Sequence, residues 1–163
     1  MTPRIVLSIA GSDSGGGAGI QADLKVFAAL RVYGTSVVTA VTAQNTRGVQ
    51  DVYPMPGNVV STQLNSLLDD LPPAAAKTGM LATAEVGAAV LAKARAGLLP
   101  NLVVDPVLSS SSGRRLGVVG AIERLLPYAL VATPNREEAS ALVGWPVSTP
   151  ADMAGAAGQL AAG

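Results

Sequence analysis

Cysteine and histidine are both absent from the 163 residues of this chain. Without cysteine, disulfide bonds and thiol chemistry are excluded. Without histidine, the chain lacks the usual general base and the commonest transition-metal ligand. Any catalysis must therefore use carboxylates, lysine, backbone donors or a hard cation such as Mg²⁺, which prefers oxygen ligands.

Charge is also scarce, since only 13% of the residues are charged and the net charge is zero. No basic block is present, which argues against nucleic acid as a partner. No apolar run is long enough to span a membrane and no signal-peptide pattern opens the chain, so we expect a cytoplasmic protein without a membrane partner. The 49% hydrophobic content fits one domain over residues 1–163 with a real core.

The most informative feature that is present is the segment from Gly11 to Asp23. Five glycines fall within nine residues, between an apolar run at 5–10 and a helical pattern at 20–30. A strand, a glycine-rich loop and a helix in this order bring backbone N–H groups together. We therefore expect these N–H groups to converge on a ligand.

Other interpretations of this loop stay open. It lacks the Gly-Lys-Ser/Thr ending of a P-loop. Residues 17–22 fit the loose G-x-G-x-x-A dinucleotide fingerprint, so a dinucleotide-dependent oxidoreductase is one alternative. Against it, residues 11–16 intervene after the strand, and the second strand ends at 42–45 without an acidic residue. A tight turn with no ligand is the other alternative.

Strand-like and helix-like segments alternate along the chain. Strands are expected at 5–10, 35–43, 49–53, 74–79, 102–106 and 130–133, although the alanines of 74–79 alone would favour helix and a loop is the second interpretation of this segment. Helices are expected at 20–30, 59–71, 83–96, 118–126, 135–143 and 149–163, with Gly34 as a helix stop and Asn58, Thr83, Asn135 and Thr149 as N-caps. The alternation predicts an α/β fold, a mostly parallel, doubly wound sheet with helices on both faces.

Polar residues gather where the predicted strands end. They are Asp13, Gln44, Asn45, Lys77, Asp105, Asn135 and Glu138. Ligands of parallel sheets bind outside the carboxyl ends of the strands, so these side chains predict one binding rim.

Several of these residues also have a purely structural interpretation. Asp105 ends a buried strand and could hold Mg²⁺ or form a turn. Asn135 and Glu138 could serve a hydrated Mg²⁺, but their spacing alone favours a helix capping box. Gln44 could read the edge of a heteroaromatic ring or lie in a surface turn.

The remaining candidates are equally ambiguous from sequence. Lys77 could hold phosphate or be solvated, and Met80 is more typical of a core than of a ligand site. Arg114 and Arg115 could bind an anion, although paired exposed arginines are common.

Five blocks taken together resemble the hydroxymethylpyrimidine/phosphomethylpyrimidine kinases of thiamine biosynthesis, which are ribokinase-like proteins. The blocks are residues 11–23, 40–46, 77–81, 104–107 and 133–139. They follow the family's order at family-like spacing. The resemblance implies a ribokinase-like fold and an ATP- and Mg²⁺-dependent kinase. Its substrates would be 4-amino-5-hydroxymethyl-2-methylpyrimidine and then the monophosphate of that pyrimidine.

The resemblance also implies roles for single residues. The pyrimidine would be bound by Gln44 and Asp23, by the backbone amide of Ala18, by Gly11, and by Met80 and Val107 packed on its ring. The nucleotide would be bound by Lys77 and Asn135, and the magnesium by Asp105 and Glu138.

Family members continue past residue 163 into a Gly-Thr-Gly-Cys anion-hole loop, so the resemblance identifies no catalytic residue here. We expect this chain alone to show little kinase activity and to form a homodimer. A non-catalytic pyrimidine-binding module of the same fold is the alternative.

Overall fold

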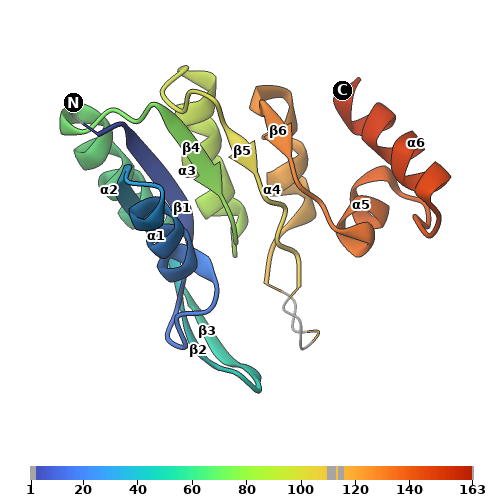
Figure 1. Ribbon diagram of the computed structural model, residues 1–163, viewed down its shortest axis with the longest axis horizontal. Helices are drawn as coiled ribbons and strands as arrows, with labels where there is room; N and C mark the ends of the chain where they lie inside the picture. Colours follow the sequence, from blue (N-terminus) through green and yellow to red (C-terminus); the bar gives the residue numbers. More distant parts are fainter. Residues whose placement is uncertain (1–2, 110–112, 114–115, 163) are drawn as a thin grey trace.

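The computed structural model describes residues 3–109, 113 and 116–162, and it contains one six-stranded sheet (Figure 1). The strands are β1 (Ile5–Asp13), β2 (Tyr33–Asn45), β3 (Gly48–Pro54), β4 (Ala75–Thr78), β5 (Val103–Val104) and β6 (Val131–Ala132). Their order is β3-β2-β1-β4-β5-β6, and every neighbouring pair is parallel except β2 with β3. The predicted mostly parallel α/β sheet is confirmed.

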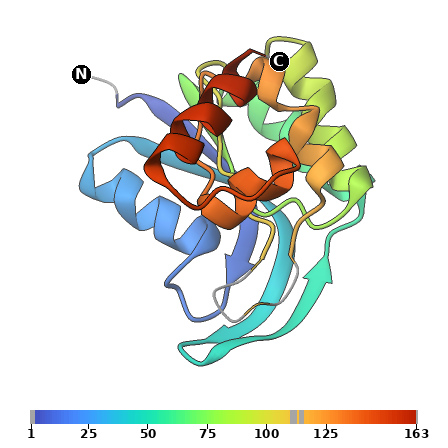
Figure 2. The same ribbon diagram turned by 90° about the vertical axis from the view of Figure 1, so that its right-hand side faces the viewer.

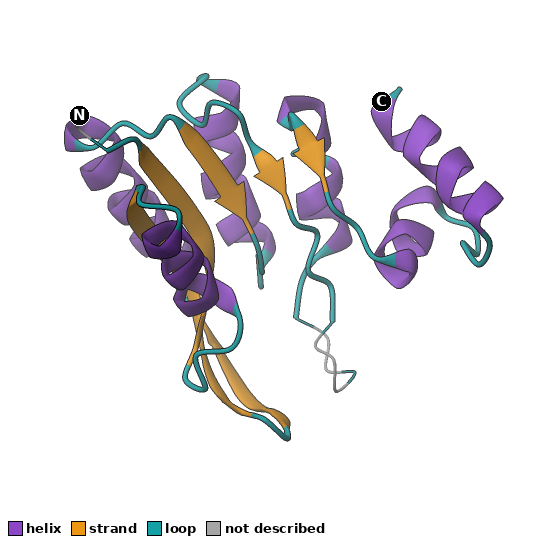
Figure 3. Ribbon diagram, in the orientation of Figure 1, coloured by secondary structure: helices purple, strands orange, loops and turns teal. Residues whose placement is uncertain are grey.

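Helices cover both faces of this sheet. They are α1 (Gly19–Ala29), α2 (Gly57–Asp70), α3 (Ala84–Arg95), α4 (Val119–Glu123), α5 (Arg136–Val143) and α6 (Pro150–Ala161). Figure 3 shows α1 in front of the sheet and α2, α3 and α4 behind it. The last two helices lie beyond β6, at the end of the molecule that faces the viewer in Figure 2. In the described part of the chain, no helix has the length and apolar character needed to cross a bilayer.

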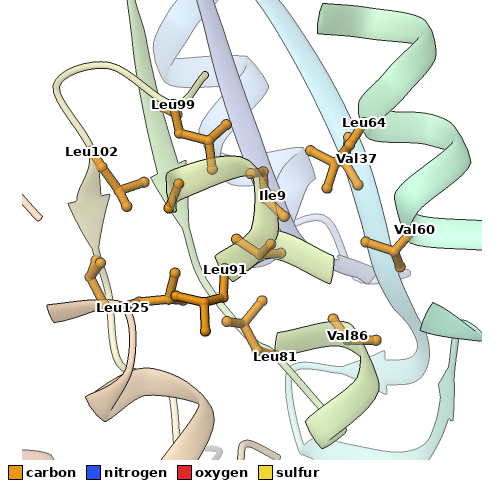
Figure 4. Packing of buried hydrophobic residues seen from close by; sticks show 14 of the residues in the cluster. Ile9, Val37, Val60, Leu64, Leu81, Val86, Leu91, Leu99, Leu102 and Leu125 are labelled. Atoms are coloured by element: carbon orange, nitrogen blue, oxygen red, sulfur yellow. The ribbon is translucent and has the colours of Figure 1, made fainter. Parts of the chain in front are cut away.

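The main core lies between the sheet and the helices behind it (Figure 4). Successive side chains of a strand point to opposite faces. In β1, Leu7 and Ile9 belong to this core, whereas the Ser8 hydroxyl bonds Asp23 of α1. The side chains of β1 therefore pack into the core on one face of the sheet and contact α1, which carries Asp23, on the other.

Local end signals in the sequence were informative for three helices. Thr83, Asn135 and Thr149 are the N-caps of α3, α5 and α6, and each side chain accepts a hydrogen bond from a backbone amide of its helix. The predicted helix over 118–126 is shorter than expected: α4 ends at Glu123, and a 3-10 turn over Leu126–Tyr128 follows. Pro127 lacks the N–H that a continuing helix would need.

Two expected helix ends are wrong. Gly34 does not stop the first helix, because α1 ends at Ala29 and Gly34 lies within β2. A Cβ at this position would lie 2.8 Å from the Phe27 side chain, so the glycine allows α1 to pack against β2. Asn58 is not an N-cap, because α2 already begins at Gly57 with Pro56 as the residue before it.

Candidate functional site

A cavity of about 600 Å³ lies at the carboxyl ends of the strands. The chain leaves β1 through α1 toward β2 on one side, and it returns through α2 to β4 on the other side of β1. Neighbouring strands whose connections run in opposite directions form a topological switch point, the usual ligand site of such sheets. Ten of the residues expected at the site line this cavity: Gly11, Asp13, Ala18, Asp23, Gln44, Asn45, Lys77, Met80, Asp105 and Val107.

The side chain of Lys77 joins two of the predicted carboxylates. Its Nζ lies 3.1 Å from Asp23 Oδ1 and 3.3 Å from Asp105 Oδ2. Asp23 Oδ2 also accepts a hydrogen bond of 2.6 Å from the Ser8 hydroxyl. β4 places this lysine on the cavity side, because its neighbours Ala76 and Thr78 are buried. One cation thus bridges two anions from α1 and from the end of β5.

Gln44 lies on the wall of the cavity at the end of β2. Its Oε1 lies 3.1 Å from the Thr42 hydroxyl, whose single hydrogen is shared with the Ser12 carbonyl at 3.0 Å. Within the described residues, its Nε2 donates to no protein group. The Gln44 side chain can therefore donate through Nε2 and accept through a remaining lone pair of Oε1. A heteroaromatic ring with a nitrogen acceptor beside an amino group would be bound by both.

The N–H groups of the glycine-rich loop converge on a protein side chain. Asp13 Oδ1 accepts from the amide of Gly15 at 2.7 Å, and Oδ2 accepts from the amides of Gly17 and Ala18 at 2.9 and 2.8 Å. The expectation that these donors are left for a ligand is thus corrected. The Ala18 amide, which the resemblance assigns to the pyrimidine, is engaged by Asp13 in this structure.

The loop packs closely on the ends of β1 and β4. Gly19 adopts a positive φ of 56°, and a Cβ on it would collide with the carbonyl oxygen of Gly11. A Cβ on Gly11 would collide with the Met80 side chain. Gly19 therefore requires glycine, whereas a side chain at Gly11 would only require the flexible end of Met80 to move.

Asn135 and Glu138 lie outside the cavity lining. They form a capping box, in which the Glu138 amide donates to Asn135 Oδ1 at 3.0 Å and Glu138 Oε2 accepts from the Asn135 amide at 2.9 Å. Burial raises the pKa of the Glu138 carboxyl, backbone hydrogen bonds from Asn135 and Leu108 partly oppose this, and the charges of Asp105 and Glu137 add to it. The capping arrangement that the spacing favoured is confirmed.

No group of three or more His, Cys, Asp or Glu side chains that could hold a metal ion occurs among the residues described. Arg114 and Arg115, the other predicted anion-binding pair, lie outside the described residues.

Sequence reasoning gave no role to Ser14, which contacts the backbone of the lining residue Gln44, or to Arg47, which is one of the lining residues. Ser14 exchanges two hydrogen bonds of 2.8 Å with the backbone of Gln44, thirty positions away. Arg47 lines the cavity from the turn between β2 and β3. No sequence signal pairs Ser14 with Gln44, because only the closure of the sheet brings them together.

Comparisons with known proteins agree with this geometry. The model of the family described as Phosphomethylpyrimidine kinase matches residues 13–163. The chain is 49% identical to the hydroxymethylpyrimidine/phosphomethylpyrimidine kinase of Streptomyces coelicolor, covering 99% of this chain and 61% of that protein. It is 51% identical to the chloroplastic thiamine biosynthetic bifunctional enzyme TH1 of Arabidopsis thaliana, covering 95% of this chain and 31% of that protein. The chain therefore spans less than two thirds of these relatives.

Solved structures show the same fold. The phosphomethylpyrimidine kinase of Clostridium difficile superposes with a TM-score of 0.86 at 40% identity, over 96% of this chain and 70% of that one. The pyridoxal kinase of Staphylococcus aureus in complex with ADP gives a TM-score of 0.85 at 38% identity, over 98% of this chain and 59% of that one.

Proposed function

Because this chain belongs to the phosphomethylpyrimidine kinase family, we propose that it forms the pyrimidine-binding region of an ATP-dependent kinase. The reaction is the phosphorylation of 4-amino-5-hydroxymethyl-2-methylpyrimidine, and then of its monophosphate, in thiamine biosynthesis. The observation that carries this proposal is the cavity at the switch point, where Gln44 stands on the wall and Lys77 bridges Asp23 and Asp105.

The polar and apolar side chains that line the cavity would together recognise the pyrimidine. An aminopyrimidine presents ring nitrogen acceptors beside an amino donor, and the amide of Gln44 complements both kinds of group. Met80 and Val107 line the cavity with apolar surface suited to a flat ring. Asp23 and the Ala18 backbone border the same space. These residues would bind and orient the ring so that its hydroxymethyl group faces the bridged carboxylates.

The donor set also fits a hydrated magnesium ion. Mg²⁺ in kinase sites keeps several waters and binds through one or two carboxylates and the phosphates of the substrate. Asp105 presents a carboxylate to the cavity, and Glu138 lies near enough for the Asp105 charge to raise its pKa. We propose these two residues as the groups that hold the ion, which would neutralise phosphate charge during transfer.

Cationic and amide groups would serve the nucleotide. Lys77 carries the ammonium group at the cavity, and we propose that it steadies the phosphates of ATP while keeping both carboxylates in place. Asn135, beside Glu138 at the start of α5, is proposed for the same phosphate network. The expected homodimer stays a prediction as well; exposed Leu130, which precedes edge strand β6, and exposed Val131 within it are compatible with a further contact.

The alternatives differ in what they bind. A non-catalytic pyrimidine-binding module would bind the pyrimidine without turning over ATP. A dinucleotide-dependent oxidoreductase finds no support, because the loop amides that would receive a pyrophosphate are engaged by Asp13.

The test is calorimetry of the hydroxymethylpyrimidine against the wild type and Gln44→Leu. Leucine would leave ring nitrogens unpaired, so we expect binding to weaken by about 1–3 kcal/mol, or about 5- to 150-fold in Kd. Asn65→Leu, an exposed amide on α2 away from the cavity, is the matched control and should bind as the wild type does. Equal affinity of Gln44→Leu and wild type would remove Gln44 from the site.

A further inference from the structure

We propose that the glycine-rich loop carries its own anion, the Asp13 carboxylate, and that Asp13 is the positioning residue that holds Gln44 in place for the pyrimidine. In this arrangement the loop binds no phosphate of substrate or nucleotide. The inference rests on the proposed function for the identity of the pyrimidine, but its first part concerns the loop alone.

The loop is filled by a buried charge. Asp13 is only 5% exposed, and its two oxygens accept three backbone N–H groups at 2.7–2.9 Å. Its carbonyl accepts a fourth amide, that of Gly16, at 3.0 Å. The carboxylate also lies beside the positive end of the α1 dipole, where an anion is stabilised. A phosphate placed on the same amides would have to displace Asp13 or meet its charge.

Side chains tie the loop down on its other sides. Gln21 Oε1 accepts from the Asp13 amide at 2.8 Å, and Gln21 Nε2 donates to the Ser12 hydroxyl at 2.7 Å. Lys25 Nζ donates to the Gly16 carbonyl at 2.6 Å. The loop thus has a defined shape without any ligand, which a loop awaiting a phosphate would not need.

Ser14 transmits this shape to the pyrimidine wall. Its hydroxyl donates to the Gln44 carbonyl and accepts from the Gln44 amide, both at 2.8 Å. Ser14 directly follows Asp13, so the filled loop sets the position of the Gln44 backbone. The orientation of the Gln44 amide then depends on a carboxylate that does not itself touch the ring.

The first experiment uses Asp13→Ala, with Asp70→Ala as the matched loss of an exposed carboxylate on α2. We expect the Kd of the pyrimidine to rise at least tenfold in Asp13→Ala and to return to within threefold of wild type when sodium formate refills the loop. We also expect formate to raise the Tm of Asp13→Ala. Sodium chloride at equal ionic strength should do neither, and formate should leave the wild type and Asp70→Ala unchanged.

The second experiment removes the hydrogen bonds between Ser14 and Gln44 and leaves the Asp13 carboxylate in the loop. Ser14 is exposed, so Ser14→Ala should keep the urea midpoint of the wild type while weakening pyrimidine binding about tenfold. Ser14→Thr retains the hydroxyl and should restore the affinity. Ser66→Ala, an exposed serine on α2, is the control.

The outcomes separate the two claims. A wild type that does not bind the pyrimidine overturns the proposed function, and the formate effect on the Tm of Asp13→Ala then still decides whether the loop holds an anion. A wild type that binds, with Ser14→Ala binding equally well, overturns the positioning role. If Asp13→Ala does not fold, the affinities of Ser14→Ala and Ser14→Thr decide whether the loop positions Gln44. Absence of any formate effect on a folded Asp13→Ala overturns the filled loop.

Discussion

Thr78 is fully buried in β4, and its hydroxyl has no hydrogen-bond partner in the part of the chain described. A buried polar group without a partner loses about 1–3 kcal/mol of solvation. Valine has the same shape with a methyl group in place of the hydroxyl. We therefore expect Thr78→Val to raise the free energy of unfolding by about 1 kcal/mol in urea titrations.

Thr39 provides the matched control for this substitution. It is equally buried, but its hydroxyl donates to the Met80 carbonyl at 2.6 Å. Thr39→Val should therefore lower the free energy of unfolding by about 1–3 kcal/mol, since it leaves that carbonyl unpaired. If Thr78→Val also lowered the free energy of unfolding, the Thr78 hydroxyl would have a hydrogen-bond partner in solution.

For single residues, the sequence predicted which side chains lie at the strand ends, but it did not predict which side chains they contact. Gln44, Lys77 and Asp105 each follow or end an apolar strand, so their place at the rim was visible in the sequence. The contact of Lys77 with Asp23 joins residues 54 positions apart. Neither residue type nor spacing marks such a pair, because the fold of β1 and β4 brings the two side chains together.

At the scale of elements, α6 begins with a capping box that is open to a pH test. Hydrogen bonds from the amides of Thr149 and Ser148 and from the Thr149 hydroxyl lower the pKa of the Asp152 carboxyl below its ordinary value of 3.8. A carboxyl whose pKa is depressed by folding adds stability above its unfolded pKa and loses it as the pH falls through the folded value. Wild type should thus be more stable than Asp152→Asn at pH 6.

Urea midpoints measured at several pH values check this expectation. The difference between wild type and Asp152→Asn should shrink as the pH falls below 3.8. Gln159→Leu is the control in the same helix, because it removes the uncharged contact of 3.0 Å with Trp145 Nε1. Its effect should not change with pH, and a pH-independent difference for Asp152→Asn would contradict the role of its charge.

Element ends were predictable where the signal is local and not where packing decides. A capping box lies within four residues, so the sequence around Asn135 and Thr149 shows it directly. Gly34 was expected to stop a helix because glycine often follows the last helical residue. The structure explains the glycine differently: Phe27 and Leu24 of α1 lie so close to β2 that a side chain at position 34 would collide with them, and this contact is tertiary.

For the whole molecule, Lys77 is the point where three parts of the fold meet. It comes from β4, and its carboxylate partners come from α1 and from the end of β5. The alternating pattern predicted a binding rim at the carboxyl ends of the strands, but not that one ammonium group would join three parts of the fold there. The three bridged side chains all line the cavity, and the bridge ties β4 to α1 and to the end of β5.

Removing the bridge should therefore cost stability as well as binding. The side chains of Lys77, Asp23 and Asp105 are 27%, 15% and 30% exposed, so solvent screens the pairs only in part. We expect Lys77→Met to lower the free energy of unfolding by about 1–2 kcal/mol, because it leaves two carboxylates facing each other without a cation. Lys93→Met, on α3 at the far face, is the control.

A double-mutant cycle isolates the contribution of the pair. Asp23→Asn removes one of the two negative charges that pair with Lys77. Lys77→Met should therefore lower the free energy of unfolding less in the Asp23→Asn background than in the wild type. We expect a coupling free energy of about 1 kcal/mol between Lys77→Met and Asp23→Asn, as contacting residues in one network show. The cycle is measured by urea unfolding in EDTA, so that no divalent cation takes the place of the ammonium group. Additive effects would mean that the bridge does not hold α1 against β4, and that Asp23 is held by Ser8 alone.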